Sequence, residues 1–349
     1  MAETPPGVDL ERLRPWFAAH VEGATDAPLH ASLISGGRSN LTYAIGDGTH
    51  EWVLRRPPLG HVLPTAHDMA REHTVLAALA NTAVPVPRTL AFCRDDAVND
   101  APFYVMEKVD GVILRTPAEL AALSPSDARR CSEGLIDALV AIHAVDYHAA
   151  GLDGFGHPDG YVERQVRRWG EQWERSKSRE LPEIEELARR LRAALPASPA
   201  PTIVHGDYRL DNTMLAPDDP GRIIAVLDWE MATLGDPLSD LGLFLVYWGR
   251  DQGNLAGTDS SMHPDSGFLT REEVAQRYAD KSGRDVSQLD FYEMLASYKL
   301  AIILEGIHAR YLIGKTVGEG FDHIGMMVEA IAKTALESAS HSSIAALRG

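Results

Sequence analysis

The run HGDYRLDN, residues 205–212, carries the strongest signal in this chain of 349 residues. Asp207 precedes Asn212 by five positions, in a predicted loop between two short apolar stretches. Asp228 follows the apolar stretch RIIAVL and lies sixteen positions beyond Asn212. A turn over Pro217–Gly221 is expected to fold the two stretches into a β-hairpin. The three polar side chains would then converge at one end of that hairpin.

This combination of side chains is typical of phosphoryl transfer. One carboxylate accepts or orients the proton of the attacking hydroxyl, while an amide oxygen and a second carboxylate hold Mg²⁺ against nucleotide phosphates. Hard oxygen ligands of this kind suit Mg²⁺ better than zinc. The hairpin therefore predicts a phosphotransferase centre.

The same motif resembles the aminoglycoside phosphotransferase and choline kinase superfamily of small-molecule kinases. Its H-G-D-x4-N spacing is also similar to the protein-kinase loop H-R-D-x4-N. Downstream, however, the triplet DWE at 228–230 stands where protein kinases have D-F-G, and no A-P-E segment follows. Those departures favour a small-molecule acceptor. Residues 228–242 and 53–58 resemble the subgroup that occurs alone in bacteria or fused to acyl-CoA dehydrogenases, and the resemblance covers most of residues 30–315.

The resemblance implies an α+β, protein-kinase-like bilobal fold. A small β-rich N-lobe, with a nucleotide-binding sheet and a helix, would span residues 1–106, and a hinge would span 107–112. A larger, mainly helical C-lobe with the catalytic hairpin would span 113–349. Within this lobe we expect the catalytic loop, the metal-binding strand end and two substrate-side helical regions at 203–215, 223–230, 161–195 and 288–315.

Local patterns agree with this arrangement. Alternation and helical spacing predict strands at 29–37, 40–46, 51–58, 85–93 and 101–111, and helices at 9–21, 67–81, 161–178, 181–195 and 288–313. A further helix is expected to end at Ala144, with Ser126 as its N-cap.

The resemblance also implies roles for individual residues. Asp207 would be the catalytic base, or the residue that orients the acceptor hydroxyl, and Asn212 and Asp228 would bind Mg²⁺. Backbone groups from Glu107 to Val109 would contact the adenine edge. A Gly-rich turn would cover the phosphates, and its residues are Gly36, Gly37, Arg38, Ser39 and Asn40.

Arg55 and Arg56 occupy the strand on which kinases usually carry a lysine. By strand alternation they point to opposite faces, and Arg55 shares the face of Val53. Arg55 is therefore the residue expected at the phosphates, and the resemblance implies that Glu72, on the 67–81 helix, pairs with it. Arginine can grip phosphate bidentately, but it is not a neutral replacement for lysine.

Several other residues have plain structural interpretations. His205 is expected to pack beneath the loop and hold its backbone, and Asp236 to brace the loop or cap a turn. Along 161–180, an aromatic and apolar stripe is expected to face the core below a solvated basic face. The alternative is a surface that recognises a phosphate-bearing or carboxylated acceptor. Lys299, in the late helix, has the same two interpretations, and helical packing with a salt-bridge partner is favoured. Asp240, like Asp236, is a candidate for bracing the site residues.

The chain has 33 Lys and Arg against 50 Asp and Glu, a formal net charge of −17. Such a charge argues against broad binding to nucleic acid or anionic membranes. The most apolar stretch, 241–249, is far shorter than the ~20 residues of a membrane span, and no signal peptide is evident. Two cysteines, Cys93 and Cys131, make neither a disulfide framework nor a zinc site. We expect a cytoplasmic monomer or homodimer.

The expected function is ATP- and Mg²⁺-dependent phosphorylation of a small-molecule hydroxyl, with GTP as an open alternative to ATP. The fusion partners of the nearer subgroup favour a hydroxyacyl-type metabolite as acceptor, and an aminoglycoside is the alternative. Arginine at position 55 leaves a third possibility, a nucleotide-binding pseudokinase or interaction module.

Overall fold

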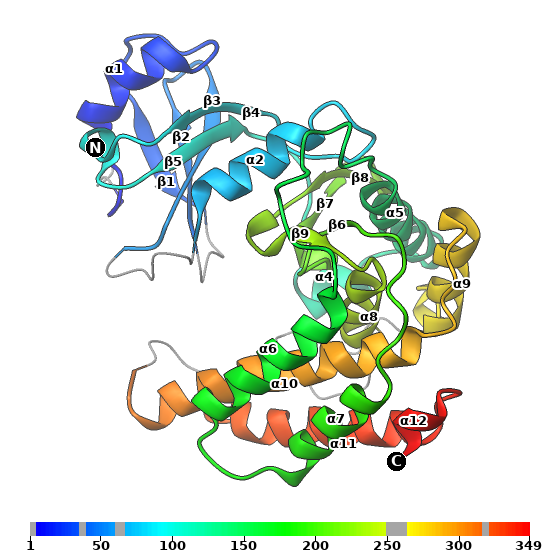
Figure 1. The fold of residues 1–349 in the computed structure, drawn as a ribbon. Coiled ribbons are helices and arrows are strands. Elements are labelled where there is room, and N and C mark those ends of the chain that lie inside the picture. The colour runs from blue at the N-terminus through cyan, green and yellow to red at the C-terminus, as the bar shows by residue number, and fades with distance from the viewer. Residues whose placement is uncertain (1–4, 35–39, 60–66, 249–263, 316–320) are drawn as a thin grey trace.

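The computed structural model describes residues 5–34, 40–59, 67–248, 264–315 and 321–349. Four residues of the expected phosphate turn, Gly36, Gly37, Arg38 and Ser39, lie outside the described residues. Figure 1 shows a small lobe that carries the N-terminus and a larger, mainly helical lobe that carries the C-terminus. The expected α+β fold with two unequal lobes is confirmed.

The small lobe is built on a five-stranded antiparallel sheet with the strand order β1-β2-β3-β5-β4. Its β-branched and aromatic residues alternate between two covered faces, as half-buried strands require. The strands are β1 (His30–Leu33), β2 (Leu41–Gly46), β3 (Glu51–Arg56), β4 (Thr89–Cys93) and β5 (Phe103–Glu107).

Each face of this sheet packs against a different helix. Leu54 joins an apolar cluster with Leu13 and Phe17 of α1 (Leu10–His20). The neighbouring residue Val53 faces the other way, into the cluster that contains α2 (Met69–Leu79). That second cluster continues without a break into the large lobe. A short helix, α3 (Asp96–Asn99), lies between β4 and β5.

The large lobe surrounds two small antiparallel ladders. In one, β6 (Thr202–Val204) pairs with β9 (Thr233–Gly235); in the other, β7 (Thr213–Ala216) pairs with β8 (Asp219–Val226). Two 3₁₀ turns, η1 (Leu210–Asn212) and η2 (Trp229–Met231), lie at the ends of these strands, and a third, η4, spans Pro264–Ser266. The helices are α4 (Pro117–Ala121), α5 (Pro125–His143), α6 (Tyr161–Ser176), α7 (Pro182–Ala193), α8 (Leu238–Tyr247), α9 (Arg271–Ser282), α10 (Leu289–Leu312), α11 (Ile324–Ser340) and α12 (Ala345–Arg348).

The long helix α10 organises the large lobe. It packs against α6, α7, α8 and α11, and Figure 1 shows it running beneath the two ladders. Most of its residues are buried on every side, which is the pattern of a helix surrounded by other helices. Among the described residues, no helix has the length and apolar character that a membrane span requires.

The connection between the lobes is tied to the catalytic hairpin. After β5 ends at Glu107, Val112 exchanges two backbone hydrogen bonds with Leu215 of β7, at 2.9 and 2.8 Å. Gly111 directly precedes Val112, and a Cβ added to it would lie 2.3 Å from the Met214 side chain. A larger residue would therefore push the connection away from β7.

The predicted N-cap of α5 is wrong by two residues. The helix begins at Pro125, and Ser124 provides the cap: its hydroxyl accepts the Asp127 N–H at 3.2 Å. Proline is favoured at the first helical position, where its missing N–H costs nothing, and this places the cap one residue earlier. The strand β9 was not expected from the sequence.

Ser124→Ala is expected to lower the free energy of unfolding by about 1 kcal/mol, because the Asp127 N–H loses its acceptor. Ser126→Ala is the matched control. The Ser126 hydroxyl lies 2.9 Å from the Ser124 hydroxyl, and its removal leaves the bond from the Asp127 N–H to Ser124 in place. Urea denaturation of both variants measures the difference. Equal losses would contradict the cap assignment.

Candidate active site

The hairpin brings the three predicted polar residues together. The Asn212 side-chain amide donates to the Asp207 carbonyl at 2.8 Å and to its carboxylate Oδ2 at 3.0 Å. The Leu227 N–H donates to the Asn212 carbonyl at 2.8 Å, which places Asp228 beside the same loop. Because both amide protons of Asn212 point at Asp207, its Oδ1 oxygen is left for another partner.

Asp207 sits in a mixed electrostatic environment. Burial raises its pKa, while Arg209, Lys299 and His205 oppose that shift and the Asp228 carboxylate adds to it. Arg209 lies 3.5 Å from the Asp207 carboxylate and 3.1 Å from the Asp211 carboxylate. Asp211 therefore pairs with Arg209 beside the loop.

A buried carboxylate, Asp240 of α8, holds the start of the loop. It accepts the backbone N–H groups of His205 at 2.6 Å and Gly206 at 2.8 Å. His143 of α5 lies 3.2 Å from the same carboxylate. Burial raises the pKa of Asp240, but hydrogen bonds from His143 and Gly206 outweigh it, and the pKa falls below its ordinary value.

The expected brace at Asp236 is therefore wrong in its target. Asp236 accepts the Leu238 N–H at 3.0 Å, as a turn cap does, and also the Tyr292 hydroxyl. Asp240, one helical turn further on, holds the loop instead. The turn-capping alternative for Asp236 is the one that the structure shows.

His205 packs beneath the loop, as expected. Its side chain is fully buried, and Nε2 lies 2.9 Å from the Leu227 carbonyl. That carbonyl directly precedes Asp228, which has a φ of 64°. A left-handed backbone is costly for a residue with a Cβ, and such residues concentrate at functional sites. His205 thus helps to hold Asp228 in an unfavourable conformation.

Arg55 links the two lobes through two carboxylates. Its Nε lies 2.9 Å from Glu72 Oε1 of α2, and its Nη2 pairs with Asp228 of the large lobe. The Glu72 side chain is 2% exposed; burial raises its pKa to about 7, although Arg55 opposes that shift. Arg56 points to the opposite face, where it donates to the carbonyl of Asn99 at 3.1 Å.

Asn40 is the described residue of the expected phosphate turn. It is fully buried, and its side-chain amide donates to Glu230 at 3.0 Å. His67 Nδ1 lies 2.8 Å from its Oδ1. The side chain of Asn40 therefore connects β2 to the turn η2, which follows Asp228. Nearby, Arg71 of α2 donates to the Ala232 carbonyl at 2.9 Å, a second link between α2 and this turn.

The expected adenine-reading segment begins at the end of β5. The Glu107 N–H donates to the Arg88 carbonyl at 2.9 Å, and its side chain accepts the Arg88 N–H at 3.0 Å. Glu107 thus closes the edge of β4, and Val109 lies half-buried two residues further on.

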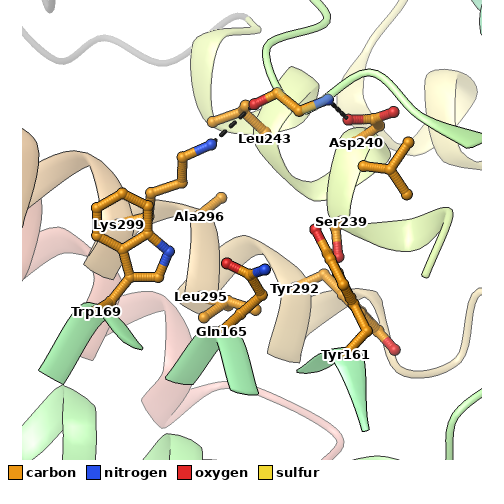
Figure 2. Close-up of a pocket in the computed structure, with 12 residues that line it drawn as sticks. Tyr161, Gln165, Trp169, Ser239, Asp240, Leu243, Tyr292, Leu295, Ala296 and Lys299 are labelled. Carbon is orange, nitrogen blue, oxygen red and sulfur yellow. Dashed lines mark hydrogen bonds between the residues drawn. The ribbon is translucent and has the colours of Figure 1, made fainter. Parts of the chain in front are cut away.

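A small cavity lies on the other side of the catalytic loop, against α6, α8 and α10 (Figure 2). Lys299 of α10 enters it and donates to the Gly206 carbonyl at 2.8 Å. Sequence analysis favoured a packing role for Lys299 and kept acceptor recognition as the alternative. The residues that line the cavity are Tyr161, Gln165, Trp169, Val204, Gly206, Ser239, Asp240, Leu243, Tyr292, Leu295, Ala296 and Lys299.

The two-lobed fold and the hairpin define a phosphotransferase with a kinase-like architecture. Residues 30–292 match the model of the phosphotransferase enzyme family, and the chain belongs to that family. The predicted family is therefore confirmed.

Curated relatives place the chain beside acyl-CoA dehydrogenase fusions. It is 34% identical to rat acyl-CoA dehydrogenase family member 11 over 336 residues, which is 94% of this chain and 43% of that protein. It is also 34% identical to mouse acyl-CoA dehydrogenase family member 10 over 316 residues, 90% of this chain and 29% of that protein. The chain spans less than half the length of these relatives.

Solved structures show the same fold. A crystal structure from Ralstonia eutropha, provisionally named as an aminoglycoside phosphotransferase, is 32% identical, with a TM-score of 0.82 over 95% of this chain and 99% of that one. A microcompartment-associated aminopropanol kinase is 20% identical, with a TM-score of 0.62 over 97% and 99% of the two chains. At 20% identity, this similarity shows the fold alone.

Asp240→Asn is expected to destabilise the fold by about 2 kcal/mol at pH 7, because an amide cannot accept both loop N–H groups. Folding lowers the pKa of Asp240. The carboxylate therefore makes its full contribution to the free energy of unfolding above the pKa of the unfolded state, about 3.9. The contribution is lost as the pH falls through the lower folded pKa. The difference between wild type and Asp240→Asn should therefore stay constant from pH 7 to about pH 4 and shrink below that pH.

Denaturant titrations across this pH range measure the effect. Asp218→Asn is the matched control, because Asp218 is an exposed carboxylate that pairs with Arg222 at 2.8 Å, and such pairs contribute little. A difference for Asp240→Asn that stays constant down to pH 3 would contradict the role given to its charge.

Proposed function

We propose that this protein transfers the γ-phosphoryl group of ATP to the hydroxyl of a small molecule, with Mg²⁺ as cofactor. The observation that carries the proposal is the convergence of Asp207, Asn212 and Asp228 at one end of the hairpin, beneath Arg55. This set supplies an acceptor for the hydroxyl proton, oxygen ligands and a cation for phosphate, which phosphoryl transfer requires.

The nucleotide would lie between the lobes. Arg55, steadied by Glu72, would bind phosphate oxygens, with Asn40 and the turn residues 36–39 above them. The backbone from Glu107 to Val109 would contact the purine. A related fold, the aminoglycoside phosphotransferase APH(4)-Ia, 15% identical with a TM-score of 0.63 over 95% of this chain and 98% of that one, was solved with ADP and hygromycin B. GTP in place of ATP remains an alternative for this chain.

The residues present fit a magnesium ion. Within the described residues no cluster of three or more His, Cys, Asp or Glu side chains could hold a metal. The pair Asn212 and Asp228 suits Mg²⁺, which usually takes one or two protein oxygens and completes its shell with water and phosphate. When bound, Mg²⁺ would neutralise charge on the phosphates. Phosphate binding would draw Arg55 away from Asp228 and leave that carboxylate available.

Asp207 would act on the acceptor. Its Oδ2 is held by Asn212, so its second carboxylate oxygen would accept the hydroxyl hydrogen and orient the oxygen towards the γ-phosphorus. The O–P bond to the acceptor would form as the bond to the β-phosphate oxygen breaks, and the hydroxyl proton would pass to Asp207. Most of the rate would come from positioning and charge.

The acceptor class follows from the relatives. The relatives are named as acyl-CoA dehydrogenase family members, which supports a hydroxyacyl-type metabolite over an aminoglycoside. One observation favours a second candidate, a nucleotide-binding protein without transfer activity. Arginine, rather than lysine, stands at position 55 and pairs with the metal-binding candidate Asp228.

Asp207→Asn is expected to lower phosphoryl transfer by about a hundredfold or more, because the acceptor loses its proton acceptor, while ATP binding is retained. A coupled ADP assay with pooled hydroxyacyl thioesters and aminoglycosides measures turnover, and calorimetry measures binding. Wild-type turnover no higher than that of Asp207→Asn, with intact ATP binding, would support the non-catalytic candidate and overturn the proposed activity.

Arg55→Met is expected to weaken ATP binding by about tenfold or more, because a buried charge-assisted contact to phosphate is lost, whereas Arg55→Lys should retain part of it. Arg56→Met is the matched control on the opposite face of β3. It should lower thermal stability and leave the affinity of the folded protein for ATP unchanged. Equal effects of Arg55→Met and Arg56→Met on ATP affinity would contradict the assignment.

A further inference from the structure

Lys299 places a positive charge beside the proposed acceptor position. Its Nζ donates to the carbonyl of Gly206, the residue before Asp207, at 2.8 Å. It therefore lies at the catalytic loop, in the cavity lined by α6 and α10. Figure 2 shows the ammonium group at the rim of the cavity, next to Trp169.

The ammonium group has unused binding capacity. Lysine carries three N–H donors, and among the described residues the Gly206 carbonyl is the hydrogen-bond acceptor found for Nζ. No carboxylate of the described residues forms an ion pair with it within 4.0 Å. The Asp207 and Asp240 carboxylates attract this partly buried cation, but neither is bonded to it, so N–H donors of Nζ are left for a ligand.

The cavity offers no free carboxylate for a cationic ligand. Asp240 lines it, but both carboxylate oxygens are already occupied by the backbone N–H groups of His205 and Gly206. The other lining residues are aromatic, apolar or uncharged, apart from Lys299. Lys299 is the cation among the lining residues, and the Asp240 carboxylate is directed at the backbone N–H groups of the loop.

A second cation stands beside the first. The Arg168 guanidinium lies 5.9 Å from the centre of the Trp169 ring, and Lys299 Nζ lies 5.9 Å from the same ring. Burial lowers the pKa of Lys299 and Arg168 adds to that shift, while the Asp207 and Asp240 carboxylates oppose it. An anion bound at this point would relieve both the desolvation of Lys299 and its repulsion by Arg168. The arrangement is cationic in a chain whose net charge is −17.

We propose that Lys299, together with Trp169 and Gln165, forms a subsite that binds a carboxylate-sized anionic group of the acceptor and so determines specificity. The cavity, about 40 Å³, has room for such a group or a few waters, and not for a multi-ring sugar. The inference rests on the proposed function, because it concerns the acceptor of the same site. It excludes polycationic acceptors from this position.

The test compares acids with neutral and cationic analogues of equal length. The probes are ω-hydroxyalkanoates of three to eight carbons, their primary amides and the matching amino alcohols, with binding measured by calorimetry in the absence of nucleotide. Wild type is expected to bind at least one acid about tenfold or more tightly than its amide. No preference for any acid over its amide, or no binding of any acid up to about 10 mM, would overturn the subsite.

Substitutions separate the charge from the contact to Gly206. Lys299→Gln keeps an N–H donor and removes the charge, so acid binding should fall to that of the amide, and Lys299→Arg should restore most of the preference. Lys333→Gln is the matched control, because Lys333 pairs with Glu329 at 3.8 Å on α11, and it should bind like wild type. Undiminished acid binding by Lys299→Gln would overturn the proposal.

Turnover distinguishes this subsite from a structural role and from failure of the proposed function. If Lys299 only held the Gly206 carbonyl, Lys299→Gln would lower kcat for acid and amide acceptors equally. We expect KM to rise about tenfold or more for the acid alone. Charge-dependent acid binding without phosphorylation of any hydroxyl would overturn the proposed function and leave the subsite intact. Phosphorylation without discrimination between acid and amide would overturn the subsite and leave the proposed function intact.

Discussion

The Asp240 carboxylate accepts two consecutive backbone N–H groups from the catalytic loop and so fixes the start of the segment that carries Asp207. Charge-assisted hydrogen bonds inside a protein are roughly twice as strong as neutral ones, and both bonds are buried or nearly so. On the other side, a Cβ on Gly206 would lie 2.7 Å from the Met231 carbonyl, and Gly206 has a φ of +83°. The loop is thus confined between α8 and η2. Asp207 directly follows Gly206, so the same contacts fix its position.

A second constraint acts between the lobes and is also electrostatic. Arg55, Asn40 and Arg71 from the small lobe bind Asp228, Glu230 and the Ala232 carbonyl, all within one short segment of the large lobe. Nucleotide phosphates would compete for the same cation that joins Glu72 to Asp228. The ion pairs of Arg55 that join the two lobes would therefore be rearranged when the nucleotide binds.

The parts that were predictable from sequence are those in which the signal is local. The hairpin spacing predicted the convergence around Asp207, and strand alternation correctly separated Arg55 from Arg56, because both follow from short-range geometry. Sequence analysis named Asp240 as a candidate brace and left Lys299 between packing and acceptor recognition, but it identified neither partner. Each residue lies in a helix whose pattern indicates packing, and their partners are backbone atoms of a loop that is distant in sequence. Hydrogen bonds to backbone leave no trace in side-chain periodicity. Ser124 was missed because two serines flank one proline, and only the helix geometry chooses between them.

The division into lobes and the division into hydrophobic cores do not coincide. The apolar cluster that includes α2 and one face of the small sheet continues into the large lobe, whereas α1 and the opposite face form a separate cluster. Cooperative unfolding follows buried apolar contacts. In folding terms, α2 and Glu72 therefore belong with the large lobe, and the outer half of the small lobe is the unit that can open on its own. A partly opened molecule of this kind would keep α2 docked on the large lobe and expose the distal face of the small sheet.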